Sequence, residues 1–442
     1  MSFEWVPFTD LLSKIVDNRG RTCPVGKTGI PLIATNCIDR SNLYPSYETT
    51  RFVSEETYKT WFRGHPEPGD ILFVCKGSPG RTNWVPDPVD FCIAQDMVAV
   101  RANPKKVHPK YLFAVLRSPT VQSQIDNMHV GTMIPHFKKG DFGKLRIPVP
   151  SLMAQREIGD LYFSLTERIS ELRETNATLE AIAQALFKSW FVDFDPVRAK
   201  LEGRTPEGMD EATAALFPDG FEESELGLVP RGWRLVPFGQ LLSQTIGGDW
   251  GSDEPTEVNN AKVAIIRGTD IPDLQTGANS RVPIRYTSQK KLATRKLEDG
   301  DIVLEVSGGS KDQPTGRALY LTNAILNQFE CPVEPASFCR LLRPNTQELG
   351  VLLGQHLTYI YAQGKTWEYQ NQSTGIANFQ TTHFLATELV AVPSDEVLAA
   401  FAAFVRQMID RMHLTQAQTL ATLRDTLLPR LISGALRLPE TL

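Results

Sequence analysis

The sequence predicts a mixed α/β protein in which two globular domains are separated by two long helices packed as an antiparallel coiled coil. Three observations lead to this prediction: an unbroken heptad pattern in the middle of the chain, a second and less regular one near its end, and a series of short motifs that occurs twice in the same order. A chain of 442 residues is long enough for two or three domains.

The first long helix is expected between Ser151 and about Trp190. Its apolar positions alternate in steps of four and three, the a/d spacing of a coiled coil. They are Ile158, Tyr162, Leu165, Ile169, Leu172, Leu179, Ala183, Leu186 and Trp190, with Asn176 as a polar member. About 40 residues at about 1.5 Å each give a rod on the order of 60 Å long, more than a small domain needs for its own core. Asn176 fits either a residue that sets helix register or a plain surface asparagine.

The partner helix is expected from Asp395 to about Ser433. Apolar residues recur there at threes and fours, but less regularly. They are Phe401, Val405, Met408, Met412, Leu420, Leu423, Leu427 and Leu431. We expect the two helices to cover each other's apolar seams; two unrelated surface helices on separate domains are the alternative.

An internal repeat places the two globular domains at 1–150 and 233–393. The pattern V-P-F-x-x-L-L-S occurs at 6–13 and again at 236–243, an offset of 230. Further matches keep the same order: 30–33 with 263–266, 69–72 with 300–303, Gly80-Arg81 with Gly316-Arg317, Ile134, Phe137 and Phe142 with Ile376, Phe379 and Phe384, and 149–151 with 392–394. The repeated unit is an α/β globule followed by a long helix, so a pseudo-twofold axis is expected to relate the two copies.

The remaining boundaries follow from the repeat. The helices are expected at 151–194 and 394–442, and the join at 195–232, rich in Gly, Pro and acidic residues, is expected to be a loop. Four aromatic side chains cluster at the end of the first helix: Phe187, Trp190, Phe191 and Phe194. They fit either packing against this linker or the binding of another subunit.

The bulk properties permit DNA binding without arguing for it. The net charge is −5, but residues 1–150 carry 19 Lys and Arg against 14 Asp and Glu, whereas residues 201–232 carry 2 against 8. Local phosphate contacts matter more than total charge. The start of the chain has no signal-peptide pattern, no apolar run is long enough for a membrane span, and the six cysteines show no paired spacing, so a cytoplasmic protein without zinc is expected.

The sequence lacks complete motifs for the catalytic functions considered. Gly26-Lys27-Thr28 resembles the tail of a phosphate-binding loop, but Arg21 stands where the motif needs glycine, and the preceding segment 11–16 is expected to be a helix rather than a strand. Nuclease-like sets are incomplete, because Ser307 replaces a lysine in one half and Val74 an acid in the other. No Asn/Asp-Pro-Pro-aromatic tetrad for adenine methylation occurs. We therefore expect no catalysis, no metal and no cofactor in this chain.

What remains is recognition by loops rich in Arg, Lys, Asn and Gln. Arg and Lys can bridge guanine O6 and N7, and Asn or Gln can bridge adenine N6 and N7. The candidate DNA-binding residues are Arg19, Arg21, Lys27, Lys76, Ser78, Arg81, Asn83, Lys138 and Lys139 in the first half, and Trp250, Lys311, Gln313, Arg317, Gln370, Asn371 and Gln372 in the second. For each residue taken singly, a solvated surface position is the alternative.

At this point the chain resembles the DNA-specificity subunit of type I restriction–modification enzymes over essentially its whole length. Residues 150–155 resemble the family's P-P-L-x-E-Q helix opening, with Ser151 in place of the second proline and Ala154 in place of the glutamate. Residues 185–194 resemble its central conserved region, and residues 423–434 its C-terminal one.

The resemblance implies a non-catalytic subunit in which each globule is a target-recognition domain that reads one half of a split site in double-stranded DNA. The helices would set the gap between the halves. Two methyltransferase subunits would dock on the helices and bring S-adenosylmethionine, and a restriction/translocase subunit would bring ATP and Mg²⁺. The rival hypotheses are a self-sufficient nuclease or methyltransferase, and a scaffold subunit of a related defence complex that does not read sequence.

Overall fold

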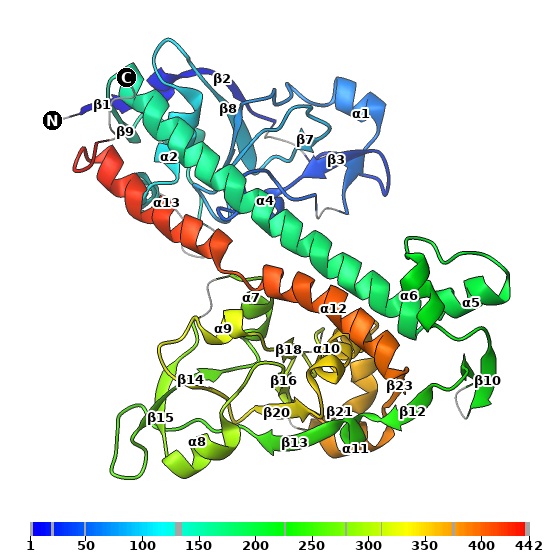
Figure 1. Ribbon diagram of the computed structural model, residues 1–442. Helices are drawn as coiled ribbons and strands as arrows, with labels where there is room; N and C mark the ends of the chain where they lie inside the picture. The colour runs from blue at the N-terminus through cyan, green and yellow to red at the C-terminus, as the bar shows by residue number, and fades with distance from the viewer. Residues whose placement is uncertain are drawn as a thin grey trace. The chain divides into compact units, whose positions relative to one another are not determined.

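The computed structural model describes residues 3–18, 22–47, 50–128, 135–224, 227–278, 281–310, 312–373 and 376–437 (Figure 1). The chain divides into two compact units. The first unit comprises Met1–Leu172 and Thr419–Leu442, and the second comprises Arg173–Gln418. Within the described ranges, no helix combines the length and apolar character that crossing a membrane requires.

The first unit is built on a four-stranded sheet of order β2-β8-β5-β6, a three-stranded sheet of order β4-β3-β7 and the antiparallel pair β1–β9. Its strands are β1 (Glu4–Pro7), β2 (Leu12–Val16), β3 (Ile30–Ile33), β4 (Phe52–Val53), β5 (Ile71–Val74), β6 (Thr82–Trp84), β7 (Cys92–Ile93), β8 (Met97–Ala102) and β9 (Arg146–Val149). Its helices are α1 (Glu55–Thr60), α2 (Pro109–Leu116), α3 (Pro119–Met128), the first half of α4 (Leu152–Phe191) and most of α13 (Gln416–Ile432), with 3-10 turns η1 (Phe8–Leu11), η2 (Thr35–Cys37) and η3 (Lys139–Asp141).

The second unit has the same strand orders: β13-β20-β16-β18, β15-β14-β19 and the pair β12–β23, to which it adds a small sheet β17-β22-β21. Its strands are β10 (Phe221–Ser224), β11 (Gly227–Pro230), β12 (Arg234–Pro237), β13 (Leu242–Gly247), β14 (Ala261–Ile266), β15 (Ile284–Thr287), β16 (Ile302–Glu305), β17 (Ser307–Gly308), β18 (Ala318–Tyr320), β19 (Val333–Pro335), β20 (Cys339–Pro344), β21 (Gln370–Ser373), β22 (Ile376–Phe379) and β23 (Leu389–Val392). Its helices, besides the second half of α4, are α5 (Asp195–Leu201), α6 (Glu211–Leu216), α7 (Ile271–Gln275), α8 (Gln289–Arg295), α9 (Asn323–Leu326), α10 (Gln347–Ala362), α11 (Thr381–Thr387) and α12 (Asp395–Met412), with turns η4 (Phe238–Leu241) and η5 (Lys365–Tyr369).

The expected helix over 11–16 is wrong, because Leu12–Val16 form strand β2 and pair with β8. The register shifts between Leu12 and Lys14, which marks a bulge at Ser13. The bulge places two exposed residues in succession between half-buried Leu12 and Ile15. Apolar residues spaced in this way imitate the three-and-four spacing of a helix.

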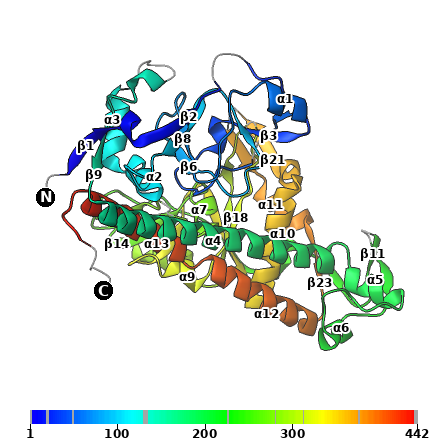
Figure 2. The ribbon, with the colours of Figure 1, turned by 90° about the horizontal axis from the view of Figure 1, so that it is seen from above.

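The helix α4 runs without interruption through 40 residues, and Figures 1 and 2 show α13 beside its first half and α12 beside its second. In the second unit Asn176 lies at the end of α12 and donates from Nδ2 to the Met412 carbonyl at 3.1 Å, while Trp190 packs on Phe401 with 5.7 Å between ring centroids. Later residues of α4 therefore lie beside earlier residues of α12, so the two helices pack antiparallel within this unit.

The expected single C-terminal helix is wrong, because α12 ends at Met412 and α13 begins at Gln416. The imidazole of His413 is buried and its Nδ1 lies 2.9 Å from the Thr322 hydroxyl, so the residue turns into the core instead of continuing the helix. In the sequence the break is visible as a step of eight between Met412 and Leu420.

The expected loop at 195–232 is also wrong. It forms α5, α6 and the β10–β11 hairpin. The segment folds because its apolar side chains, Val197 and Phe217 among them, join the core of the second unit. Asp210 caps α6 by accepting a hydrogen bond from the Thr213 N–H at 2.9 Å.

Candidate nucleic-acid interface

The strands β2 and β5 each pair antiparallel with β8, so they run parallel to each other and end at the same edge of the sheet. There Lys76 forms a β-bridge with His136, and the Gly77 N–H donates to the Pro135 carbonyl at 3.0 Å. The Lys76 N–H donates to the carbonyl of Asp96, the residue before β8, at 3.2 Å. We call this surface the first edge; it comprises residues 76–78, 96 and 135–139.

The second unit builds the equivalent edge from β13, β16 and β20. The pairing of Ser307 with Asn378 takes the place of the Lys76–His136 bridge. The Ser307 N–H donates to the carbonyl of Phe338, the residue before β20, at 3.3 Å. We call this surface the second edge; it comprises residues 248–250, 307–310, 312–313, 338, 370–372 and 377–378.

Several of the expected DNA-binding residues lie at the first edge. Lys76, Ser78 and Lys138 are exposed there. Lys139 is half-buried, and its Nζ lies 3.3 Å from an Asp17 carboxylate oxygen. Lys27 is exposed, but it follows Gly26, which bridges to Phe52 beside the three-stranded sheet, and no described contact joins it to this edge. Arg19 and Arg21 lie outside the described residues.

Two first-half candidates have structural roles instead. Asn83 is fully buried, and its Nδ2 donates to the carbonyls of Asp39 and Asn42 at 2.9 and 2.7 Å, so the expectation of a DNA contact is wrong for this residue. Arg81 is half-buried, and its Nη2 donates to the Thr35 carbonyl at 3.1 Å. Both side chains hold the segment around η2 against the sheet.

At the second edge Gln313 and Asn371 are exposed. The Asn371 Oδ1 accepts from Gln380 Nε2 at 2.7 Å, and the Gln370 Oε1 accepts from the Thr315 N–H at 3.0 Å. Lys311 and the side chain of Gln372 lie outside the described residues.

Two further second-half candidates have specific partners. Arg317 is not available for a base, because its Nε and Nη2 donate to the buried carboxylate of Glu305 at 2.8 and 2.5 Å, and this pairing also raises the pKa of the guanidinium. Trp250 is exposed, with the Arg285 guanidinium 4.4 Å from its ring centroid.

Four further residues lie at the edges although the sequence patterns did not predict them there: His136, Ser307, Phe338 and Asn378. Their positions depend on where strands begin or end and on short β-pairings, which no local sequence pattern predicts. The one available signal was the repeat itself, because His136 and Asn378 each immediately precede a matched phenylalanine, Phe137 and Phe379. Among the described residues, no group of His, Cys, Asp and Glu side chains could hold a metal ion.

The aromatic cluster at the end of α4 belongs to the core of the second unit. Phe187, Trp190 and Phe191 are at most 6% exposed and contact Phe401 of α12. Phe194 is half-buried against Trp233, with 5.7 Å between ring centroids. The expectation that Phe187, Trp190 and Phe191 bind another subunit is therefore wrong, because the folded segment 195–232 and α12 already cover them. For the half-buried Phe194 it stays a prediction.

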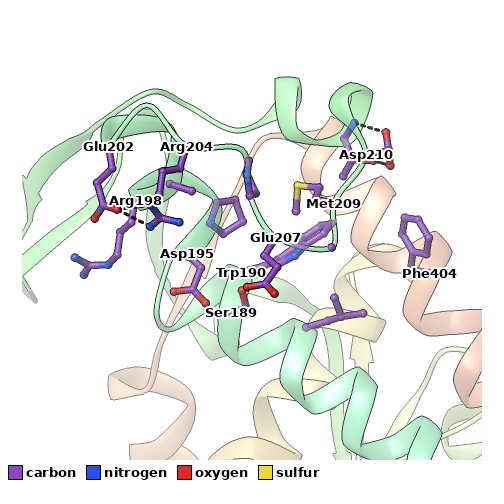
Figure 3. Close-up of a pocket in the computed structure, with 16 residues that line it drawn as sticks. Ser189, Trp190, Asp195, Arg198, Glu202, Arg204, Glu207, Met209, Asp210 and Phe404 are labelled. Atoms are coloured by element: carbon purple, nitrogen blue, oxygen red, sulfur yellow. Dashed lines mark hydrogen bonds and ion pairs between the residues drawn. The ribbon is translucent and has the colours of Figure 1, made fainter.

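A cavity of about 680 Å³ opens beside this core, between α4, the segment 195–213 and Phe404 of α12 (Figure 3). Arg204 is paired there with Glu202 at 2.8 Å, and Arg198 donates to the Asp193 carbonyl at 2.8 Å. The carboxylates of Asp195 and Glu207 also line the cavity, and its rim includes the half-exposed Phe404. Its lining thus combines apolar side chains with acidic and basic ones.

Comparisons with known proteins find relatives among the specificity subunits of type I restriction enzymes. Residues 27–181 match the family described as the type I restriction modification DNA specificity domain. The chain is 28% identical over 421 residues to the type I restriction enzyme HindI specificity subunit of Haemophilus influenzae, covering 83% of this chain and 86% of that one. It is 22% identical over 339 residues to the MjaIX specificity subunit of Methanocaldococcus jannaschii, covering 75% of this chain and 70% of that one.

The fold is also similar to a solved one. The S subunit of a type I restriction–modification system from M. genitalium superposes with a TM-score of 0.54 at 16% identity and covers 100% of this chain and 97% of its own. The family description names a DNA specificity domain, and the relatives are named as specificity subunits of type I restriction enzymes. The resemblance found in the sequence is thus confirmed by the comparisons.

Proposed function

We propose that this chain is the DNA-specificity subunit of a type I restriction–modification complex and that it binds a bipartite target, with one half-site for each unit. The observation that carries the proposal is the edge built twice on the same strand order, with different side chains on each copy. A common framework with variable edge residues is what two readers of different half-sites require, because base contacts specify sequence while the scaffold only positions them.

The helix α4 supports a fixed gap between the half-sites. It contributes residues to both units without interruption, and a continuous helix has a fixed rise per residue. We infer that α4 and its partner helices set the spacing as a length. A pseudo-twofold relation between the two copies is part of this proposal.

The remaining partners follow from the same proposal. Two methyltransferase subunits dock on the long helices and supply S-adenosylmethionine, and restriction/translocase subunits supply ATP and Mg²⁺; the complex acts in the cytoplasm. The cavity beside Trp190 supports a docking role, because Phe404 is 49% exposed at its rim and an exposed large apolar side chain is a frequent interface residue. Phe404→Asp is expected to reduce the amount of methyltransferase subunit that co-purifies.

The test is selection from a random-sequence DNA pool with the full chain, co-expressed with its methyltransferase partner. An enriched motif of two short blocks with a fixed gap supports the proposal. No enrichment, with the complex still assembled, would favour the alternative of a scaffold that does not read sequence. Transfer of a labelled methyl group by the purified chain alone would instead show that it is itself a methyltransferase.

A further inference from the structure

The two edges share a pattern of backbone hydrogen bonds but differ in side-chain chemistry. In the first unit the N–H groups of Cys75 and Lys76 donate to the Asp96 carbonyl at 2.9 and 3.2 Å, and in the second those of Val306 and Ser307 donate to the Phe338 carbonyl at 2.9 and 3.3 Å. Phe338 therefore occupies the place of Asp96. An acidic residue in one copy and a large apolar one in the other present different surfaces to DNA.

Phe338 is conspicuous because it is 66% exposed, although a phenylalanine is usually buried. A second exposed aromatic side chain lies on the adjoining segment. The Gly248 N–H donates to the Cys339 carbonyl and the Asp249 N–H to the Pro335 carbonyl, both at 3.0 Å, so the chain that carries Trp250 runs directly beside Phe338. The second edge thus has apolar surface that the fold itself does not cover.

A row of polar side chains continues the second edge. Ser307 is paired with Asn378, and Asn378 with Asn371, across neighbouring antiparallel strands. Directly opposed residues in such strands project from the same face. The Ser307 hydroxyl donates to Asn378 Oδ1 at 2.8 Å, which orients an amide on the exposed side. The corresponding places in the first unit hold Lys76 and His136.

Amide and apolar groups suit an A·T pair, whereas cations suit guanine and phosphate. In the major groove, Asn can bridge adenine N6 and N7, and an apolar side chain can contact the thymine 5-methyl group. Lysine instead donates to guanine O6 and N7 or to a phosphate.

We propose that Phe338 contacts the 5-methyl group of a thymine in the half-site bound by the second unit, beside an adenine bonded by Asn378 or Asn371. The inference rests on the proposed function, and it makes Phe338 a specificity-determining residue. The methyl group becomes buried against the ring, so the contact is apolar and independent of salt.

The test uses the bipartite motif selected by the full chain with its methyltransferase partner. Each thymine of the second unit's half-site is replaced in turn by uracil, which differs only in lacking the 5-methyl group, and Kd is measured for the wild type, Phe338→Ala and Phe338→Leu. At one position uracil is expected to weaken wild-type binding about three- to fivefold, the effect of one buried methyl group. Phe338→Ala is expected to lose this sensitivity, and Phe338→Leu to retain part of it.

Leu228→Ala is the matched control, because Leu228 is 59% exposed on β11 of the same unit and lies outside the second edge. It is expected to keep the wild-type response to uracil. Equal uracil sensitivity of the wild type and Phe338→Ala, or a second half-site without an A·T pair, overturns the inference and leaves the proposed function intact. A selection that yields no bipartite motif removes both.

Discussion

Arg101 holds the buried carboxylate of Asp70 through two parallel hydrogen bonds, with Nε 2.8 Å from Oδ1 and Nη2 3.0 Å from Oδ2. In the second unit Arg343 holds Asp301 in the same way, at 2.8 and 2.7 Å. Each aspartate precedes the strand that leads to a candidate edge, β5 or β16. The two units therefore share this internal ion pair, whereas the side chains at their edges differ. The ion pair belongs to the common fold, and the edge residues are what distinguishes the two units.

Asp70→Asn should destabilise the first unit, because the substitution keeps the size of the side chain but leaves the guanidinium of Arg101 without its buried counter-charge. We expect the free energy of unfolding to fall by about 1–3 kcal/mol. Urea unfolding measures the change. Glu55→Gln is the control, since Glu55 belongs to the exposed ion pair with Lys59, and it should change stability by less than about 0.5 kcal/mol. Equal effects of the two variants would contradict a structural role for the buried pair.

The buried carboxyl of Glu334 should make stability depend on pH. Neither of its oxygens has a hydrogen-bond partner among the described residues, and burial, followed by the nearby Asp249, raises its pKa from 4.5 to about 7. Between these values the folded state binds the extra proton. The free energy of unfolding contributed by this group therefore falls as the pH rises from 4.5 to 7 and stays low above that range.

Glu334→Gln removes this penalty and should raise the free energy of unfolding at pH 8 by up to about 3 kcal/mol, with little change at pH 4.5. Urea midpoints at the two pH values measure the difference. Glu330→Gln makes the same charge change at an exposed position nearby and should leave the pH profile unchanged. A Glu334→Gln profile parallel to that of the wild type would show that the carboxyl titrates normally.

Lys76 and Lys138 should contribute to binding mainly through phosphate or guanine contacts of the first edge. Alanine at both positions should weaken binding of the first unit's half-site and reduce the slope of log K against log salt by about 1 for each phosphate that a lysine no longer neutralises. Titrations at several salt concentrations, with each half-site scrambled in turn, measure the effect. Lys59→Ala removes an exposed charge on α1 and should leave the slope unchanged. Equal weakening at both half-sites would contradict the proposal that each unit reads its own half-site.

Removing one heptad from α4 together with one from α12 should shorten the gap between the half-sites. Seven helical residues span about 10 Å, which corresponds to about three base pairs. Site selection with the shortened chain should return the same two blocks with a smaller gap. An unchanged gap would rule out the helices as the determinant of spacing.

The sequence by itself determined the features that depend on local pattern. The a/d spacing identified α4, because a helix with one apolar stripe must repeat it every three or four residues. The repeated motifs located both globules, because the same short strands and turns need the same residues. The type of side chain at the candidate edges, rich in Lys, Asn and Gln, was also visible.

Only the tertiary structure decided which of these side chains are available. Asn83 and Arg317 are residue types that often contact DNA, but here both are bound within the protein. Asn83 donates to the carbonyl of Asp39, which is far from it in the sequence, and Arg317 donates to the Glu305 carboxylate on the neighbouring strand. Ser13 shows the same dependence, since a bulge interrupts an apolar spacing that continues in the sequence. Burial and pairing depend on partners that are distant along the chain, and no local pattern contains them.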